Sequence, residues 1–333
     1  MWLIVGDLHL TDRASDQYRF GIFDWMRRQQ AKDVAATFLL GDLTNQKDHH
    51  SATLVNKIVA GLVSLKPPVY IDRGNHDYKA NQANPFFHFL NHIEGLTFAT
   101  EPLVVTEQRR LALIPHYRTQ EEFDAAIRLV MADNSPPTCL FVHQTFEGAI
   151  AETGVRLSGL SAAGVEPLGL PLGVYAGDVH RPQTQGDVTY VGCPYQVRFG
   201  DNFEPRCIRL SRTGVESHPW FDAPRKWSLK IRDSYDIETN ANLYDGDQVK
   251  LTVEVPREEV VEWKTTKQRI LTACKVKGLE VHGIALEAKG VTQTKGGVGK
   301  KLGRTTDIFD AFCTHENVGS SIRKKGRDIL NGN

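Results

Sequence analysis

Five clusters of polar residues stand where short apolar runs of the sequence end. They are Asp7-Leu8-His9, Gly41-Asp42, Gly74-Asn75-His76-Asp77, Val142-His143 and Gly177-Asp178-Val179-His180. Together they offer carboxylates, imidazoles and an amide, but no thiolate. Such mixed oxygen and nitrogen ligands suit Mn, Fe or Zn in an open catalytic site rather than a closed structural zinc site. The clusters therefore indicate a catalytic metal centre.

The third cluster, Gly74-Asn75-His76-Asp77, is the most specific of the five. A turn made of glycine, asparagine and aspartate would explain three of its residues, but neither the histidine nor the other four clusters. The first cluster taken alone would more often be a turn aspartate and a surface histidine. It is the ordered set of five that favours a metal site.

Short apolar strands alternating with amphipathic helices would position these clusters. Strands are predicted at Trp2–Val5, Thr37–Leu40, Val69–Ile71, Leu111–Ile114, Thr138–Val142, Gly173–Ala176 and Val188–Val191. Helical spacing marks Tyr18–Gln29, Leu54–Leu65 after a Ser51 cap, and Phe123–Val130. This is an α/β pattern of stacked layers. Because the strand ends of such sheets face a shared crevice, the five clusters would converge there.

The pattern changes at the stretch His218–Pro224, where we place a domain boundary. We predict a first domain over residues 1–217 and a small α+β domain over residues 226–333. In the second domain the alternation of Val249–Val255 predicts a half-buried strand, Pro256–Val276 a helix and Leu279–Leu286 a further strand.

In their order, the five clusters resemble the motifs of the calcineurin-like metallophosphoesterases: D-x-H, G-D, G-N-H-[DE], H and G-H-x-H. Within that superfamily the chain is similar to the nuclease subunits of SbcCD-type DNA break-processing complexes, including phage recombination endonucleases. Ile114-Pro115-His116 and the loop Gly192–Gly200 add to the likeness, which weakens beyond Gly200. The resemblance implies a layered sandwich of two central sheets flanked by helices. A small C-terminal α+β domain that binds DNA and docks a partner would follow.

The resemblance also implies two divalent metal ions with a shared ligand, Mn²⁺ being expected and Mg²⁺ the alternative. One ion would be held by Asp7, His9, Asp42 and His180, and the other by Asp42, Asn75, His143 and Asp178. Two neighbouring ions can activate a water molecule and clamp the scissile phosphate. His76 would not bind metal but would stabilise the transition state or protonate the leaving oxygen, with Asp77 orienting its imidazole.

Asp178 departs from the family pattern, which has histidine at that position. In one interpretation the carboxylate replaces the imidazole as a ligand, adds a negative charge and shifts the preference toward Mn or Mg. In the other, Asp178 is a turn residue and the second metal site is degraded. The intact Gly177, Val179 and His180 around it leave both interpretations open.

The charge composition gives no support for nucleic-acid binding, because 40 Lys and Arg balance 40 Asp and Glu. From Lys226 onward there are 19 basic and 15 acidic residues. The stretch Lys289–Arg304 is rich in glycine and has no acidic residue. It is either a linker or a loop that grips the DNA backbone through Lys295, Lys300, Lys301 and Arg304.

Five cysteines without a CxxC pair make a disulfide framework unexpected. Neither a signal-peptide core nor an apolar run of membrane-spanning length is present, so we expect no membrane association. Together these features predict a cytoplasmic protein, in the host cytoplasm if the chain is phage-encoded.

Three functions remain open: a DNA exonuclease or endonuclease, a small-molecule or protein phosphoesterase, and a catalytically weakened docking subunit. The separate C-terminal domain favours the first over the second. The complete set of Asp7, His9, Asn75, His76 and His180 favours the first over the third. The resemblance further implies DNA as substrate, a homodimer, and a coiled-coil ATPase of the SbcC type as partner.

Overall fold

The computed structural model describes residues 1–79, 85–106, 110–132, 135–289 and 322–325. Internal contacts divide the chain into two compact units, Met1–Val255 with Glu259–Glu287 and Pro256–Glu258 with Ala288–Asn333. Nearly all the described residues belong to the first unit; of the second, residues 322–325 are helical. The basic candidates Lys295, Lys300, Lys301 and Arg304 lie outside the described residues.

A six-stranded sheet carries the first three clusters. Its strand order is β12-β11-β1-β2-β3-β4. The strands are β1 (Trp2–Gly6), β2 (Ala36–Leu40), β3 (Val69–Asp72), β4 (Leu96–Ala99), β11 (Cys207–Leu210) and β12 (Val215–His218). The strands β1 to β4 run parallel, whereas β11 and β12 pair antiparallel at one side. Because β1, β2 and β3 are parallel neighbours, their carboxyl ends lie side by side.

A second six-stranded sheet, with the order β5-β6-β7-β8-β10-β9, carries the other two clusters. Its strands are β5 (Leu103–Val105), β6 (Leu111–Ile114), β7 (Cys139–His143), β8 (Val174–Gly177), β9 (Gln183–Gln185) and β10 (Val188–Tyr190). The four strands β6, β7, β8 and β10 are parallel. The second sheet therefore also presents adjacent carboxyl ends.

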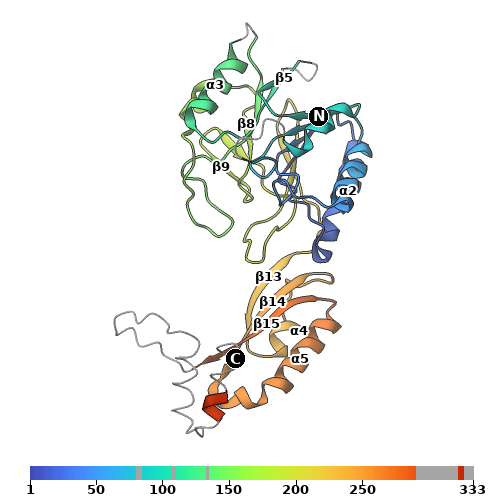
Figure 1. Ribbon diagram of the computed structural model, residues 1–333, viewed down its shortest axis with the longest axis vertical. Helices are drawn as coiled ribbons and strands as arrows, with labels where there is room; N and C mark the ends of the chain where they lie inside the picture. Colours follow the sequence, from blue (N-terminus) through green and yellow to red (C-terminus); the bar gives the residue numbers. More distant parts are fainter. Residues whose placement is uncertain (80–84, 107–109, 133–134, 290–321, 326–333) are drawn as a thin grey trace, which may run out of the picture. The chain divides into compact units, whose positions relative to one another are not determined.

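The two sheets pack face to face, as their shared core shows. Phe38 of the first sheet and Phe141 of the second lie 4.5 Å apart between ring centroids, inside a cluster drawn from both sheets. The outer face of the first sheet packs against α1 (Gly21–Gln30) and α2 (Ala52–Val63), and that of the second against α3 (Gln120–Met131). Figure 1 shows α2 and α3 on opposite sides of the strands. The predicted sandwich of two sheets flanked by helices is confirmed.

Local sequence signals set where the helices begin. The Ser51 hydroxyl accepts the Leu54 N–H at 3.1 Å, which confirms the predicted cap of α2. Thr119 and Glu122 form a capping box at the start of α3. A 3₁₀ helix precedes α1, so the predicted helix from Tyr18 is α-helical only from Gly21. The 3₁₀ helices are Ala14–Phe20, Phe86–His92, Ala162–Gly164, Glu166–Leu168 and Arg257–Glu262.

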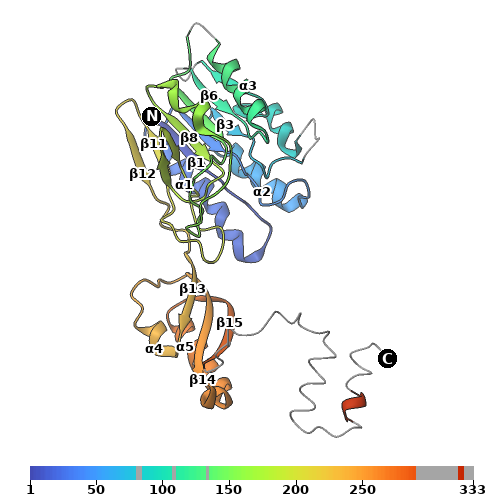
Figure 2. The same ribbon diagram turned by 90° about the vertical axis from the view of Figure 1, so that its left-hand side faces the viewer.

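A three-stranded sheet follows in the order β13-β14-β15. Its elements are β13 (Lys226–Ile231), α4 (Ser234–Glu238), β14 (Gln248–Pro256), α5 (Trp263–Val276) and β15 (Glu280–Lys289). Apolar residues of α4 and α5 pack on one face of this sheet, which Figure 2 shows from the side. The predicted helix Pro256–Val276 was too long at its start, because Pro256 ends β14 and the next turns are 3₁₀.

All seven strands predicted in the first two hundred residues are present. The short strands β4, β5, β9, β11, β12 and β13 were not foreseen. The strand β12 ends at His218 and β13 begins at Lys226, on either side of the predicted boundary. Since the three-stranded sheet belongs to the same compact unit as the large sheets, the two-domain division stays a prediction. In the described part of the chain, four cysteines are buried free thiols and no helix has the length and apolar character needed to cross a membrane.

Candidate metal centre

Left-handed backbone marks the strand ends that carry the candidate ligands. The φ angle is +24° at Asp7, +41° at His9, +50° at Asp42 and +75° at Asp178. Each lies within three residues of the end of β1, β2 or β8. Non-glycine residues in such conformations cost about 1–3 kcal/mol each and persist where the surrounding structure holds them. The backbone is therefore strained at the residues whose side chains point toward the candidate metal centre.

Asp42 stands at the centre of the site. Its Oδ2 lies 3.5 Å from Nε2 of His9, and its Oδ1 lies 3.5 Å from Nε2 of His143. Two groups of three residues can each hold a metal ion, because the ligand atoms within each group lie within 4.8 Å of one another. The groups are His9, Asp42 and His76, and Asp7, Asp42 and His143. Asp42 belongs to both groups, and its two oxygens face different histidines. This is the arrangement expected of a carboxylate shared by two metal ions.

His9 and His180 bring two imidazoles together on one side of Asp42. Their Nε2 atoms are 2.9 Å apart, and both residues are buried. Burial, reinforced for His9 by the neighbouring His180, lowers the pKa of His9 well below its usual value. Burial likewise lowers the pKa of His180 to about 4. Both rings are therefore neutral near pH 7 and can offer nitrogen lone pairs to a cation.

His143 lies on the other side of Asp42, next to its Oδ1. Its Nδ1 donates to the Leu40 carbonyl at 2.6 Å, which leaves Nε2 as the acceptor nitrogen. That Nε2 lies 3.7 Å from Asp178 Oδ1 and has no hydrogen-bond partner. The Oδ2 of Asp7 and the Oδ1 of Asn75 are likewise buried and unpartnered. Buried polar atoms normally have hydrogen-bond partners. Three potential ligand atoms without such partners around the Asp42 carboxylate therefore fit a bound metal ion.

The charges of this centre call for a cation. Burial raises the pKa of Asp42 well above its usual value, and burial against the opposing effect of His143 raises the pKa of Asp7 to about 7. Burial alone would lower the pKa of His143, but Asp42, Asp178 and Asp7 raise it to about 10. The three carboxylates around His143 thus favour a positive charge at this place, which divalent ions would supply while His143 binds them through a neutral imidazole.

Two glycines allow the strand ends to approach each other. A Cβ atom at Gly74 would collide with the Asp42 carboxylate, and one at Gly41 would collide with the His143 ring. Gly41 also has φ +84°, which suits glycine. The glycines of the G-D and G-N-H-D motifs therefore give the ligands room to meet.

The structure changes the predicted role of Asp77. Its Oδ2 accepts the N–H groups of Asp42 and Gly74, both at 2.8 Å, and its Oδ1 accepts that of Leu43 at 3.0 Å. The His76 imidazole instead donates from Nδ1 to the Asn45 carbonyl at 2.9 Å. Asp77 therefore fixes the backbone around Asp42, and Asn45 orients His76. The residue type alone could not show this, because a carboxylate can accept from ring and backbone N–H groups alike.

Asp178 lies inside the site rather than on a free turn. Its Oδ1 accepts from Asn75 Nδ2 and its Oδ2 from the Thr145 hydroxyl, each at 2.6 Å, while its own N–H donates to Asp7 Oδ1 at 3.0 Å. These contacts place Asn75 and Asp178 together beside His143. Thr145 was not foreseen, and its only sequence signal is its position two residues after His143.

Three further residues lie near the site: His116 and the loop that contains Tyr195 were named from the sequence only as part of the resemblance, and Arg19 was missed. Arg19 donates from Nη1 to the His9 carbonyl at 2.6 Å, and the Tyr195 hydroxyl donates to the Leu8 carbonyl. His116 hydrogen-bonds the Tyr78 hydroxyl at 3.1 Å and packs 6.1 Å from the His143 ring. The charge of Arg19 next to the apolar face of α1 was the signal that could have drawn notice.

Residues 2–143 match the family described as calcineurin-like phosphoesterase. The chain contains a calcineurin-like phosphoesterase domain. Members of this family are metal-dependent hydrolases with two divalent ions, in agreement with the two groups of ligand atoms that share Asp42. A search of curated proteins found no match.

The match to the calcineurin-like phosphoesterase family ends at His143, the last residue of β7. Asp178 and His180 lie beyond it, and their place at the centre follows from their contacts with Asn75, His143 and His9. The chain therefore completes the site with β8 of the second sheet.

Proposed function

We propose that this chain is a two-metal-dependent phosphodiesterase that cuts DNA, as the nuclease subunit of an SbcCD-type recombination or repair complex. The observation that carries the proposal is the position of Asp42 between His9 and His143, with one oxygen 3.5 Å from each. Two ions bound there would polarise the phosphate and activate a water molecule for in-line attack. Mn²⁺ is the ion proposed, with Mg²⁺ as the alternative.

The protein's own groups would do the remaining work. We assign Asp7, His9, Asp42 and His180 to one ion and Asp42, Asn75, His143 and Asp178 to the other. His76 fits a role toward the substrate, because Asn45 fixes its Nδ1 proton and leaves Nε2 free to receive or deliver a proton. The same ring also lies within ligand distance of His9 and Asp42, so metal binding by His76 is the alternative to test.

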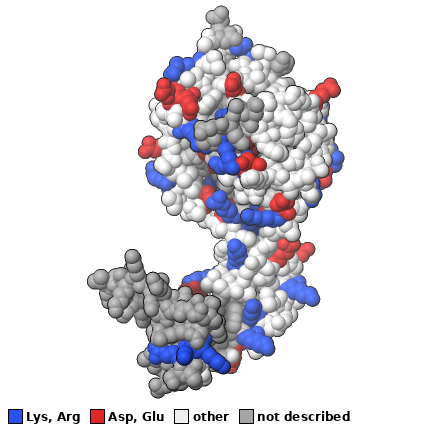
Figure 3. All heavy atoms as spheres, viewed as in Figure 1, with Lys and Arg blue, Asp and Glu red and all other residues white. Residues whose placement is uncertain are grey.

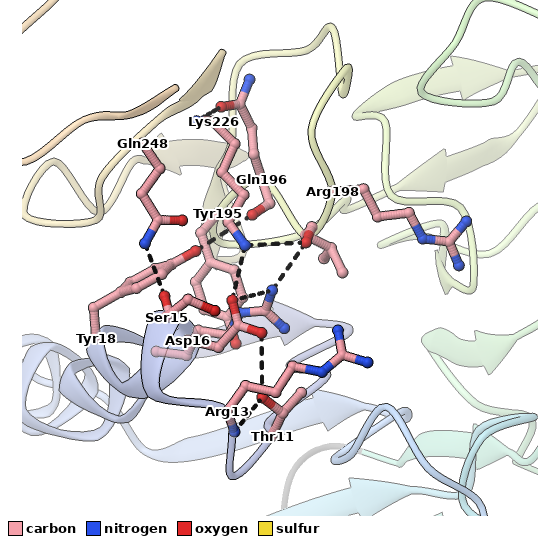
Figure 4. Close-up of polar contacts among 12 residues, drawn as sticks. Thr11, Arg13, Ser15, Asp16, Tyr18, Tyr195, Gln196, Arg198, Lys226 and Gln248 are labelled. Atoms are coloured by element: carbon pink, nitrogen blue, oxygen red, sulfur yellow. Dashed lines mark hydrogen bonds and ion pairs between the residues drawn. The ribbon is translucent and has the colours of Figure 1, made fainter. Parts of the chain in front are cut away.

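Two exposed arginines support a polyanionic substrate. Arg13 follows the His9 loop, and Arg198 is close enough to His180 to act on its pKa. Both guanidinium groups point to the same side in Figure 4. On the face of the molecule drawn in Figure 3, basic and acidic side chains are interspersed. The proposal therefore assigns phosphate contacts to these two arginines rather than to a broad basic surface.

The partner, the homodimer and the C-terminal DNA contacts of the proposal rest on the resemblance to SbcCD-type nucleases. If Lys295, Lys300 and Lys301 touch DNA, replacing all three with Gln should flatten the slope of log affinity against log salt by about two to three units. Cleavage of a small phosphodiester should not change, because none of these lysines is a proposed ligand of the metal centre. An unaltered slope would assign the segment to a linker.

The deciding experiment compares three substrates: a linear duplex, a chromogenic phosphodiester and a chromogenic phosphomonoester, each with Mn²⁺ or Mg²⁺. It is run with and without a coiled-coil ATPase and ATP. Duplex cleavage that chelation abolishes supports the proposal. Turnover of the small esters alone would favour the small-molecule phosphoesterase, an alternative that the zero net charge of the chain supports. Full metal binding without turnover of any substrate would indicate a docking subunit.

A further inference from the structure

A buried group of charges lies directly behind the metal ligand His9. It consists of Asp16, Arg19 and Lys226, whose side chains are 5%, 2% and 5% exposed. Asp16 Oδ1 lies 3.1 Å from Arg19 Nη2 and accepts from Lys226 Nζ at 2.8 Å. Figure 4 shows the Lys226 side chain extending toward Asp16. β13, the first strand of the three-stranded sheet, thus begins with a contact to the 3₁₀ helix Ala14–Phe20, which follows the first metal loop.

The Arg19 guanidinium donates hydrogen bonds to the backbone carbonyls of two loops. Its Nη1 donates to the carbonyl of His9 at 2.6 Å, and its Nη2 donates to the carbonyl of Val197 at 2.9 Å. The guanidinium also lies 5.3 Å from the centroid of the Tyr195 ring, whose hydroxyl donates to the Leu8 carbonyl. The planar guanidinium thus serves both carbonyls at once with two different nitrogens.

The backbone of His9, which Arg19 contacts, has a strained conformation. His9 has φ +41°, a conformation that L-residues adopt only where neighbouring groups hold it. Its N–H donates to the Asp42 carbonyl at 2.8 Å, so the Arg19 contact fixes the other end of the same residue. The direction of the His9 imidazole toward Asp42 therefore depends on both contacts.

Lys226 completes this support from the three-stranded sheet. Its N–H donates to Gln196 Oε1 at 2.6 Å, and its Nζ also reaches the Val197 carbonyl at 3.3 Å. A second strand of the same sheet contributes Gln248, whose Nε2 donates to the Ser15 carbonyl at 2.8 Å. Asp16 offsets part of the positive charge of Arg19 and Lys226 next to the carbonyl of His9.

We propose that Arg19, anchored through Asp16 to Lys226, is a positioning residue for the metal ligand His9. The first residue of the three-stranded sheet thereby becomes part of the support of the metal centre. A purely structural role would leave metal affinity untouched, whereas groups that orient metal ligands typically change it by about 10- to 100-fold. The inference rests on the proposed use of His9 as a ligand.

The test is calorimetric titration of the full chain with Mn²⁺ alone. Arg19→Lys keeps the charge but cannot reach both carbonyls, and it should weaken Mn²⁺ binding by about tenfold or more. Lys226→Met should weaken Mn²⁺ binding by a smaller factor of about three, whereas Lys226→Arg, which keeps the positive charge, should bind Mn²⁺ as the wild type does. With a small phosphodiester, the variants should need more Mn²⁺ for half-maximal activity while the KM at saturating Mn²⁺ stays the same.

Matched controls come from the same elements. Arg27→Lys changes an exposed arginine of α1 paired with Asp24, and Lys230→Met removes an exposed, ion-paired lysine of β13. Neither should alter Mn²⁺ affinity. Unchanged Mn²⁺ binding by both Arg19→Lys and Lys226→Met, even with a lower melting temperature, would overturn the positioning role. A wild-type chain that takes up no Mn²⁺ would overturn the metal assignment itself, which is a separate result.

Discussion

The charged residues of the metal centre and those around Lys230 on the three-stranded sheet differ in burial, although both groups lie beside opposite charges. Asp7 and His143 are 0% exposed and Asp42 is 2% exposed. On the small sheet, Lys230 contacts Glu254 at 2.8 Å and Glu287 at 3.0 Å, yet its side chain is 57% exposed. Water solvates the second group and is excluded from the first.

Burial makes the charges of the metal centre interdependent. Without solvent, each carboxylate needs a proton, a cation or hydrogen-bond donors, and removing one partner leaves the others uncompensated. Exposed ion pairs lack this dependence, because water replaces a lost partner at little cost. The comparison predicts large effects of substitution at the strand ends, intermediate effects in the buried group behind them and small effects at the exposed ion pairs of the three-stranded sheet.

The largest effect is expected from Asp42→Ala. Because Asp42 faces both His9 and His143, its loss should release both metal ions and lower kcat/KM for a small phosphodiester by at least about a thousandfold. Metal content and turnover measured on the same sample check this. Asp33→Ala is the matched control, since Asp33 also has a left-handed backbone, at φ +59°, but is exposed. A variant that keeps both ions would show that Asp42 is not shared.

The next effect concerns stability. Burial alone would raise the pKa of Asp16, but Arg19 and Lys226 outweigh it and hold the pKa below its usual value. Asp16→Asn leaves these two cations without their shared carboxylate and should cost on the order of 3 kcal/mol of unfolding free energy at pH 7. A carboxyl with a depressed folded-state pKa stabilises above its unfolded-state value, about 4, and loses this contribution as the pH falls through the folded-state value.

Urea unfolding at pH 7 and pH 3 therefore measures the charge of Asp16 directly. The difference between wild type and Asp16→Asn should shrink in acid. A difference of the same size at both pH values would mean that the side-chain shape, rather than the charge, stabilises this region.

His76→Ala should lower turnover by at least about a hundredfold while leaving metal content largely intact, because His76 is assigned to the substrate. Activity and Mn²⁺ stoichiometry are measured together. Loss of a bound ion in this variant would make His76 a ligand, as its proximity to His9 and Asp42 also allows.

Asp178→Ala should lower activity at limiting Mn²⁺ by about tenfold, because the carboxylate lies beside His143 and Asn75 and its loss would weaken one ion. Asp178→His, which restores the family residue, should retain activity with a changed metal preference. Wild-type activity of Asp178→Ala at limiting Mn²⁺ would leave Asp178 as a residue that only fixes Asn75 and Thr145.

The sequence predicted most of the sandwich and the convergence of its strand ends, because buried parallel strands are continuous apolar runs that polar residues terminate. It could not assign hydrogen bonds. Asp77 holds the backbone of Asp42, Leu43 and Gly74 rather than the His76 ring, and nothing in the residue type distinguishes these partners. Arg19 and Lys226 were missed because they meet only in the fold, 207 positions apart. Short strands such as β9 and β12 lack a buried apolar run.

The smallest effect is expected from Lys230→Met, the exposed counterpart of the change at Asp16. The hydrogen bonds that Lys230 donates to the Glu254 and Glu287 carboxylates raise the pKa of Lys230. A raised folded-state pKa stabilises fully below the unfolded-state value, about 10.4, and this contribution disappears as the pH rises through the folded-state value. Since solvent screens the pair, the melting temperature at pH 7 should fall by less than about 2 °C. Added salt should reduce the difference further. Thermal melts at pH 7 in low and high salt check this, and a decrease as large as that of Asp16→Asn would show that burial does not separate the two groups of charges.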